Sequence, residues 1–277
     1  MMVTIINHKP VLSVVEGSQI ENRIEFPPWY GELGWEIMSW APYCRMQAKG
    51  RDSVIVTSFE GMAPLYADFA TGFKSHGQAG RGLDYPKMYR PNGIYHKYGR
   101  PEQCAYSFDC LIHARGISRK STINYRGWGD LLALIKKMPM TCAVIGSAKD
   151  HNPYDLWDVQ GFRNVDLRGL ELQKLMNQIS HARLVVGVSS GLMHLAAACG
   201  TNIVTWGDRR TYFGETLEQR YKVTWNPFDV KVGWLDGWQP GPERIAEKVK
   251  EIYEGTIAKY TATAGRSDDV HAGSERL

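Results

Sequence analysis

Long apolar runs, cysteine motifs and a strong charge imbalance are all missing from this chain of 277 residues. No stretch approaches the roughly 18 apolar residues of a membrane-spanning helix. The N-terminus lacks the basic region and the continuous apolar core of a secretory signal. The five cysteines form no Cys-x-x-Cys pair, which argues against a disulfide framework or a zinc site. We therefore expect a reduced, cytoplasmic protein without a transmembrane segment.

The charge balance and several missing motifs narrow the function classes. Lys and Arg number 33 and Asp and Glu 29, so the net charge is +4. This permits a phosphate-bearing partner but lacks the dense basic stripe of a dedicated nucleic-acid binder. The sequence contains no Asp-x-Asp triplet, His-Glu-x-x-His helix or Walker loop, motifs that indicate particular metal or nucleotide sites. We expect neither a bound metal nor a cofactor.

What is present is the composition of a globular protein, with 43% hydrophobic and 22% charged residues. Short apolar runs alternate with helical patterns, and the last four runs are nearly continuous, as in parallel strands buried on both faces. This alternation predicts an α/β fold with open parallel sheets. The predicted strands are 3–6, 24–26, 53–57, 109–113, 141–145, 184–188 and 202–205. The predicted helices are 129–137, 170–181, 191–199 and 242–253.

The order of these elements predicts two α/β halves, residues 1–108 and 109–260. Residues 72–103 are rich in glycine and show little periodicity, which predicts an irregular connection or a loop-rich part of the first half. Residues 226–242 are rich in Trp, Gly and Pro and are interpreted as a linker before the last helix. Residues 261–277 are small, polar and aperiodic, which predicts a flexible tail. Ligands of such sheets bind beyond the carboxyl ends of the strands.

One predicted strand ends at a short polar turn that suits phosphate binding. Ser189 or Ser190 can cap the helix that follows, and Gly200 can end it. The first-turn N–H groups of this helix have no intrahelical partner and form an anion site. His194 lies one turn into the helix and is expected to face the mouth of this anion site. The same small residues would also let a helix pack closely on a sheet, so both interpretations stay open at this point.

This segment resembles the C-terminal signature of the ADP-heptose:lipopolysaccharide heptosyltransferase family, glycosyltransferases of the GT-B fold. The signature is approximately Asp-[Ser/Thr]-Gly-x-x-His-Leu-Ala-Ala-Ala, and this chain has SSGLMHLAAA at 189–198, with Gly207 after the next strand. Upstream, DLRGLELQKLMNQISHA at 166–182 resembles the leucine-containing run of the family. The resemblance covers residues 166–207. It implies a GT-B fold, in which the parallel sheets of two Rossmann-like domains face each other across a cleft.

The resemblance places a nucleotide-diphosphate sugar, the donor, on the second domain. Its diphosphate would lie on the helix that starts at Ser190. The basic loop after the strand at 109–113 would face the diphosphate, and in it Arg126 stands two positions before a Trp, as in the family. An Arg beside a pyrophosphate supplies charge-assisted, often bidentate bonds. The other candidate donor contacts are Arg115, Arg119, Lys120, His113, Gly146, Glu171, Ser189, Gly191, Leu192 and His194.

Several of these residues also have a purely structural interpretation. His113 can be a core histidine at the end of its strand, Glu171 a solvated helix position, and the basic loop a solvated loop. Gly146 begins a loop that can face the nucleotide base. Ser189 stands where the family has an aspartate near the donor sugar, which indicates a different sugar or a rearranged pocket.

A glycine loop in the first domain carries the implied acceptor side. The sequence GELGWEI resembles the family loop Gly-x-[Leu/Met]-Gly-Asp, whose acid acts as catalytic base. Gly31 and Gly34 match this loop, whereas Trp35 occupies the place of the acid. Glu36, or else Glu32, is therefore the candidate base, which inverting transfer needs to take the proton of the acceptor hydroxyl. Either acid can instead serve in the first turn of a helix.

Together these features predict a glycosyltransferase that is inverting and metal-independent. The acceptor stays open between a glycan and a hydroxymethylated base in DNA. In the second case the basic middle loop, with Lys87, Arg90, Lys97 and Arg100, would grip the phosphate backbone. A nucleotide-sugar epimerase of the same fold and a non-catalytic sugar-nucleotide binder are further alternatives.

Tryptophan is frequent, with nine residues in the chain. Two clusters flank the glycine loop and the last linker, where the rings can stack on sugars or bases or pack the core. The members are Trp29, Trp35, Trp40, Trp225, Trp234 and Trp238.

Overall fold

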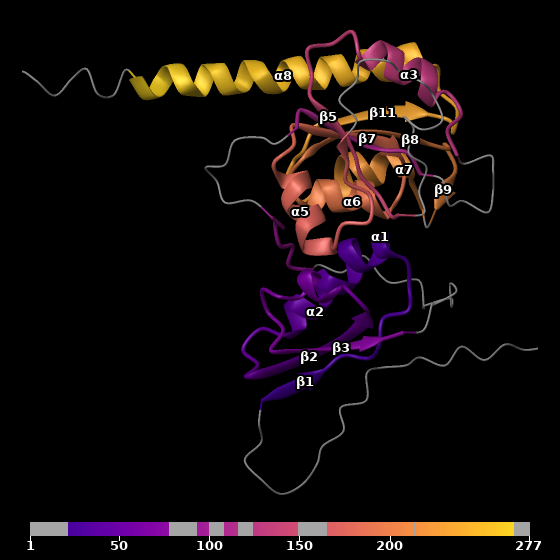
Figure 1. Cartoon of the computed structure of the whole chain (residues 1–277). Coiled ribbons are helices and arrows are strands. Elements are labelled where there is room, and N and C mark those ends of the chain that lie inside the picture. Colours follow the sequence, from indigo (N-terminus) through magenta and orange to yellow (C-terminus); the bar gives the residue numbers. More distant parts are fainter. Residues whose placement is uncertain are drawn as a thin grey trace, which may run out of the picture.

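The chain forms two halves, each built on a parallel sheet (Figure 1). This computed structural model describes residues 22–77, 93–99, 108–115, 124–148, 165–212 and 214–268. We call residues 22–99 the N-terminal half and residues 108–268 the C-terminal half. The predicted strand at 3–6 and much of the predicted connection 72–103 lie outside the described residues.

A three-stranded sheet forms the N-terminal half, in the order β1 (Arg23–Glu25), β2 (Ser53–Phe59) and β3 (Gly72–His76). Buried and half-buried residues alternate along β2, as in a strand with one face on the core. The helical segments are α1 (Leu33–Trp35), η1 (Glu36–Trp40), α2 (Ala41–Gln47) and η2 (Ala63–Leu65). The prediction of an irregular connection from residue 72 was wrong for β3, because this half-exposed strand lacks a continuous apolar run.

The C-terminal half contains a six-stranded, all-parallel sheet in the order β11-β8-β7-β4-β5-β6. Counted along the chain, this is the order 3-2-1-4-5-6 of a doubly wound sheet, whose topological switch point lies between β4 and β7. The strands are β4 (Cys110–His113), β5 (Cys142–Val144), β6 (Val165–Asp166), β7 (Leu184–Val188), β8 (Asn202–Gly207) and β11 (Val232–Asp236).

Helices cover both faces of this sheet (Figure 1). On one face lie α3 (Trp128–Ile135) and α8 (Pro242–Asp268). On the other face, toward the N-terminal half, lie α5 (Leu172–Ser180) and α6 (Gly191–Ala198). The smaller elements are β9 (Thr211–Tyr212), β10 (Glu215–Thr216), α7 (Leu217–Gln219) and η3 (Arg220–Thr224).

Two predictions for the C-terminal half need correction. Residues 226–242 contain the edge strand β11, because the short run from Val232 pairs with β8 despite its glycine and tryptophan neighbours. The helix predicted at 242–253 continues to Asp268, past the predicted start of a tail at residue 261. Once a helix is nucleated by a buried face, each further residue adds a hydrogen bond at little cost, so an aperiodic sequence can extend it.

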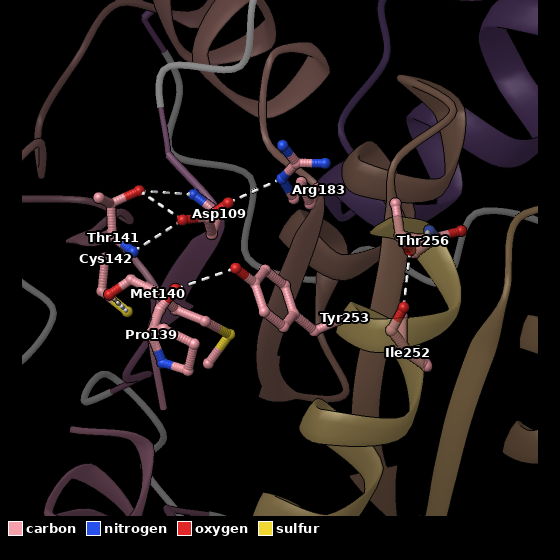
Figure 2. Close-up of polar contacts among 10 residues, drawn as sticks. Asp109, Pro139, Met140, Thr141, Cys142, Arg183, Ile252, Tyr253 and Thr256 are labelled. Carbon is pink, nitrogen blue, oxygen red and sulfur yellow. Dashed lines mark hydrogen bonds and ion pairs between the residues drawn. The ribbon is translucent and has the colours of Figure 1, made fainter. Parts of the chain in front are cut away.

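A polar cluster ties the amino ends of the strands of the large sheet together (Figure 2). One carboxylate oxygen of Asp109 accepts the N–H and the hydroxyl of Thr141 at 2.8 and 2.9 Å. Its other oxygen accepts Nε of Arg183 at 2.7 Å. From α8, the hydroxyl of Tyr253 donates to the carbonyl oxygen of Pro139 at 2.9 Å. These contacts lie at the end of the sheet opposite the carboxyl ends of the strands.

Residues 93–99 join the two halves. The carbonyl oxygen of Ile94 accepts Nη1 of the buried Arg45 on α2 at 2.8 Å. At the other end of the segment, the N–H of Tyr98 donates to the carbonyl of Ala198, the last residue of α6, at 3.1 Å. The segment therefore connects α2 of the first half to the C-terminal end of α6.

None of the helices in the described part of the chain combines the length and the apolar character that a bilayer span demands. The cysteines that the structure describes, Cys44, Cys110, Cys142 and Cys199, are buried and free.

Candidate functional site

Polar residues meet at the switch point between β4 and β7. His113 ends β4 and pairs in register with Gly187, just before β7 leads into Ser189 and Ser190. Ser190 Oγ lies 3.3 Å from Nδ1 of His113. Arg115 donates from Nη1 to the carbonyl oxygen of Ser189 at 3.4 Å. The sheet topology thus brings four of the predicted donor contacts together at one point.

Helix α6 begins directly after this turn, which we call the Ser189–Ser190 turn. Ser190 occupies the predicted N-cap position in an extended conformation, but its side chain does not cap the helix, because its hydroxyl lies against His113. By helical geometry the N–H groups of Gly191 and Leu192 have no intrahelical acceptor. Together with the helix dipole they favour an anion at this end of α6. At the other end, Gly200 has φ +75°, as expected for a helix-ending glycine.

Tyr221 of η3 supports the turn, and sequence analysis did not identify it. Its hydroxyl lies 3.2 Å from Oγ of Ser189, accepts the N–H of Ser190 at 3.2 Å and donates to the carbonyl of Ser190 at 3.3 Å. Burial raises the pKa of Tyr221 to about 12, so the phenol keeps its proton at neutral pH. No motif or spacing marks this residue, because its role depends on how η3 packs.

His194 is buried in the junction between the halves, so its side chain is not exposed at the mouth of the predicted anion site. Its ring is stacked on Tyr221 with a centroid distance of 4.2 Å, and it lies 4.8 Å from the ring of Trp225. Burial, together with the charge of Arg220, lowers the pKa of His194 to about 3, so the ring is neutral. Its Nδ1 has no hydrogen-bond partner within the described residues.

Two glycines let the N-terminal half approach the turn closely. A Cβ on Gly34 of α1 would lie 3.2 Å from Cδ2 of His194 and 3.3 Å from Cα of Gly191. A Cβ on Gly191 would lie 2.9 Å from the backbone nitrogen of Gly34. The next residue, Trp35, packs edge-on against Trp225 of the other half at 4.8 Å. The predicted acceptor-side loop therefore lies directly against the start of α6.

The two candidate acids of this loop lie in different surroundings. Glu36 is 1% exposed, and its Oε1 accepts hydrogen bonds from the hydroxyls of Ser58 and, at 2.6 Å, Tyr66. Burial raises the pKa of Glu36 to about 7, although both hydrogen bonds act in the opposite direction. Glu32 is exposed at the N-cap of α1. Glu36 thus points into the N-terminal half, whereas solvent reaches Glu32.

The tryptophan clusters belong mainly to the core. Trp35 is half-buried, and the rings of Trp29 and Trp40 stack on each other at 5.6 Å. A Cβ on Gly31 would collide with the ring of Trp29, so this glycine of the predicted loop is required by packing. The buried members are Trp29, Trp40, Trp225 and Trp234, and Trp238 is half-buried.

Three predicted donor contacts lie on other loops at the carboxyl side of the sheet. Arg126 is exposed before α3, and its backbone N–H donates to Oε1 of Gln239 at 3.0 Å. The carbonyl of Gly146, after β5, accepts the N–H of Gly169 at 2.9 Å. Glu171 is exposed before α5. Among the contacts between described residues, none joins these three to the Ser189–Ser190 turn.

The remaining predictions concern basic helpers and metals. Arg119, Lys120, Lys87, Arg90 and Arg100 lie outside the described residues. Lys97 is exposed, and its aliphatic end lies where a Cβ on Gly200 would be. Where the structure describes the chain, no three His, Cys, Asp or Glu side chains are grouped to hold a metal ion.

Known proteins resemble this chain in sequence over one region and in structure over most of its length. The model of glycosyltransferase family 9 (heptosyltransferase) matches residues 126–240, which include the Ser189–Ser190 turn and Tyr221. No curated protein matches the chain. The structure of E. coli ADP-heptose lps heptosyltransferase II is similar, with a TM-score of 0.58 and 13% identity, covering 84% of this chain and 98% of that chain. A glycosyl transferase family 9 structure from Veillonella parvula DSM 2008 gives a TM-score of 0.57 at 10% identity, covering 87% and 100%. Both likenesses indicate a shared GT-B fold.

Proposed function

We propose that this chain transfers a sugar from a nucleoside-diphosphate donor to an acceptor hydroxyl, with inversion and without a metal ion, because residues 126–240 match the model of glycosyltransferase family 9 (heptosyltransferase) and the fold resembles that of a solved heptosyltransferase. The observation that carries this proposal is the meeting of Arg115, the Ser189–Ser190 turn and the start of α6 at the switch point. Doubly wound sheets bind their ligands at this point.

The donor diphosphate gains negative charge as its bond to the anomeric carbon breaks. Groups that stabilise this charge in the transition state accelerate the transfer. The N–H groups of Gly191 and Leu192 provide fixed positive poles, and Arg115 adds a full charge beside them. We assign this role to Arg115 rather than Arg126, because Arg115 already contacts Ser189. These groups replace the charge that a metal ion would supply, so transfer is expected to persist in EDTA.

A base must take the proton of the acceptor hydroxyl. Glu32 is exposed on the loop that lies against α6, where an acceptor can reach its carboxylate. Glu36 has a pKa near 7 that suits proton transfer at neutral pH, but it is bonded to Ser58 and Tyr66 inside the N-terminal half. We therefore assign the base to Glu32 and a structural role to Glu36.

The variants Glu32→Gln and Glu36→Gln separate these roles. Glu32→Gln is expected to abolish transfer and to leave binding of the nucleoside diphosphate unchanged. Transfer that survives in Glu32→Gln but is lost in a folded Glu36→Gln protein would reassign the base to Glu36.

The acceptor in this proposal is a glycan hydroxyl. The family model that matches the chain is that of a heptosyltransferase, and the described basic residue of the middle loop, Lys97, lies against α6 at Gly200. Ser189, whose hydroxyl lies 3.2 Å from that of Tyr221, stands where the family has an acid near the donor sugar. We expect a sugar other than heptose for this reason.

The first test is thermal stabilisation by ADP, GDP, UDP and CDP, because a ligand that binds the folded state raises the midpoint of unfolding. We expect a selective shift with one diphosphate that is lost in Arg115→Ala. Arg51→Ala, an exposed arginine of the N-terminal half, is the matched control and should keep the shift. A well-folded protein that none of the diphosphates stabilises would contradict the proposed function.

A further inference from the structure

The π-helical segment η3 contacts both sides of the junction through two consecutive residues. On one side, Tyr221 uses its hydroxyl to bind three groups of the Ser189–Ser190 turn. A phenol can donate one hydrogen bond and accept two. The arrangement is complete when Ser189 Oγ and the Ser190 N–H donate and the phenol donates to the Ser190 carbonyl.

The phenol ring itself is held firmly. Tyr221 is 0% exposed, and His194 stacks on it with an angle of 3° between the rings. Trp234 stacks on the phenol at 5.9 Å. Because aromatic rings surround the phenol, its hydroxyl cannot turn away, and the position of the Ser189–Ser190 turn follows that of η3.

On the other side, Arg220 holds the N-terminal half. Its guanidinium carbon lies 5.4 Å from the ring centre of Trp35 and 5.1 Å from that of Trp225. These distances are within the range of cation–π attraction, which is stronger where water is excluded. Arg220 is buried, and Trp35 belongs to α1, so this contact ties the acceptor-side loop to η3.

We propose that η3 positions both substrates of the transfer. Tyr221 orients the Ser189–Ser190 turn so that the first N–H groups of α6 point at the donor diphosphate. Arg220 keeps Trp35, and with it the loop that carries Glu32, against the same helix. The inference rests on the proposed function, since its ligand is the nucleoside-diphosphate part of the donor. Tyr221 and Arg220 are positioning residues, which act through the turn and through the loop.

The test for Tyr221 uses Tyr221→Phe, which keeps the ring and removes the hydroxyl. Calorimetric titration of the wild type with ADP, GDP, UDP and CDP first identifies the diphosphate that binds. With that diphosphate we expect about tenfold weaker binding by Tyr221→Phe, while the thermal midpoint without ligand stays within a few degrees. Ser189→Ala, which removes one of the three partners, should weaken binding less, and Lys222→Gln, an exposed control on η3, should leave it unchanged.

The test for Arg220 uses Arg220→Met, which keeps much of the aliphatic volume and removes the charge. We expect the dissociation constant of the diphosphate to stay within about twofold, while kcat of sugar transfer with the matching nucleotide sugar falls about tenfold. A drop in thermal stability without a change in kcat would show that the contact is only structural.

The outcomes separate this inference from the proposed function. If the wild type binds none of the diphosphates, the proposed function fails and the inference fails with it. If the wild type binds one of them and Tyr221→Phe binds it equally well or more tightly, the inference about η3 is overturned and the proposed function stands. If Tyr221→Phe does not fold, Ser189→Ala takes its place. An unchanged affinity of Ser189→Ala for the diphosphate then overturns the inference about η3, and the proposed function stands.

Discussion

The two ends of the six-stranded sheet use polar groups in opposite ways. At the amino end, Asp109, Thr141 and Arg183 bond to one another, so their polar groups are engaged within the cluster (Figure 2). At the carboxyl end, the start of α6 presents N–H groups without intrahelical acceptors. Groups that bond to one another hold strands in place, and groups that point outward can bind a ligand. The polar groups at the amino end are therefore structural, and those at the carboxyl end are the ones proposed to bind the donor.

The largest effect is expected at the amino end. Asp109→Ala removes the carboxylate that accepts Nε of Arg183 and the N–H of Thr141, so we expect it to lower the free energy of unfolding by about 3 kcal/mol. Asp109→Asn keeps one acceptor oxygen and should cost less. Urea denaturation measures both changes. At temperatures where the variants are folded, their affinity for a nucleoside diphosphate should equal that of the wild type. A loss of affinity would contradict the claim that the amino end of the sheet has only a structural role.

Glu36 sharpens the comparison, because its carboxyl group is hydrogen-bonded within the protein, like the amino-end cluster, although it lies near the junction. Its pKa is raised from 4.5 to about 7 in the folded protein. Between these values the unfolded chain has lost the proton and the folded chain keeps it, so stability falls as pH rises from about 4.5 to about 7. The loss amounts to roughly 3 kcal/mol at 1.36 kcal/mol per pKa unit.

The difference in stability between wild type and Glu36→Gln isolates this effect. His194 has the opposite dependence, because its pKa is lowered to about 3 and stability contributed by the neutral ring falls as pH decreases below 6.5. That dependence is present in both proteins and cancels in the difference. A difference that does not change with pH would show that Glu36 is ionised in the folded state at neutral pH.

At the junction, Gly191→Ala tests the close approach of the two halves. The new Cβ would meet the nitrogen of Gly34 at 2.9 Å and Cβ of Leu33 at 3.1 Å, so α1 must move away from α6. We expect a loss of about 1–2 kcal/mol in stability, as in other overpacked sites, and a larger loss of sugar transfer. Gly72→Ala is the control, because its Cβ would meet Ile55 at an ordinary 3.5 Å.

The smallest effects distinguish the two arginines of the donor side. Arg115→Ala should weaken diphosphate binding about tenfold, equivalent to 1.4 kcal/mol, because a charge-assisted contact is lost. Arg126→Ala should weaken it less than about threefold, since Arg126 lies exposed beside Gln239. Neither change should alter stability. Calorimetric titration gives the ranking, and a stronger effect of Arg126→Ala would favour the assignment that the family resemblance implies.

The sequence was most informative where a local pattern decides the structure. The apolar run at 184–188 became β7 with the predicted bounds, and the helix predicted at 191–199 became α6. Both depend on neighbouring residues, on burial of a continuous apolar strand and on a glycine that ends the helix. β3 and β11 were missed, because short strands at sheet edges need no continuous apolar run.

The sequence predicts a candidate site at the Ser189–Ser190 turn, but it does not predict the residues that support this turn. The turn at residues 189–190 follows from the motif and from the topology of the sheet. Arg220 and Tyr221 reach the turn and α1 through the packing of η3, and the mixed polar sequence of η3 has no pattern that indicates such contacts. Similarly, the spacing that singled out Glu36 does not reveal its burial, which depends on Ser58 and Tyr66 from distant segments.

The most direct test of the account is a crystal structure with the nucleoside diphosphate that stabilises the protein. We expect phosphate oxygens at about 3 Å from the backbone nitrogens of Gly191 and Leu192, with the guanidinium of Arg115 beside them. The Ser189–Ser190 turn should keep its bonds to Tyr221. A diphosphate bound elsewhere on the chain, with the start of α6 unliganded, would contradict the claim that the carboxyl end of the sheet is the donor site.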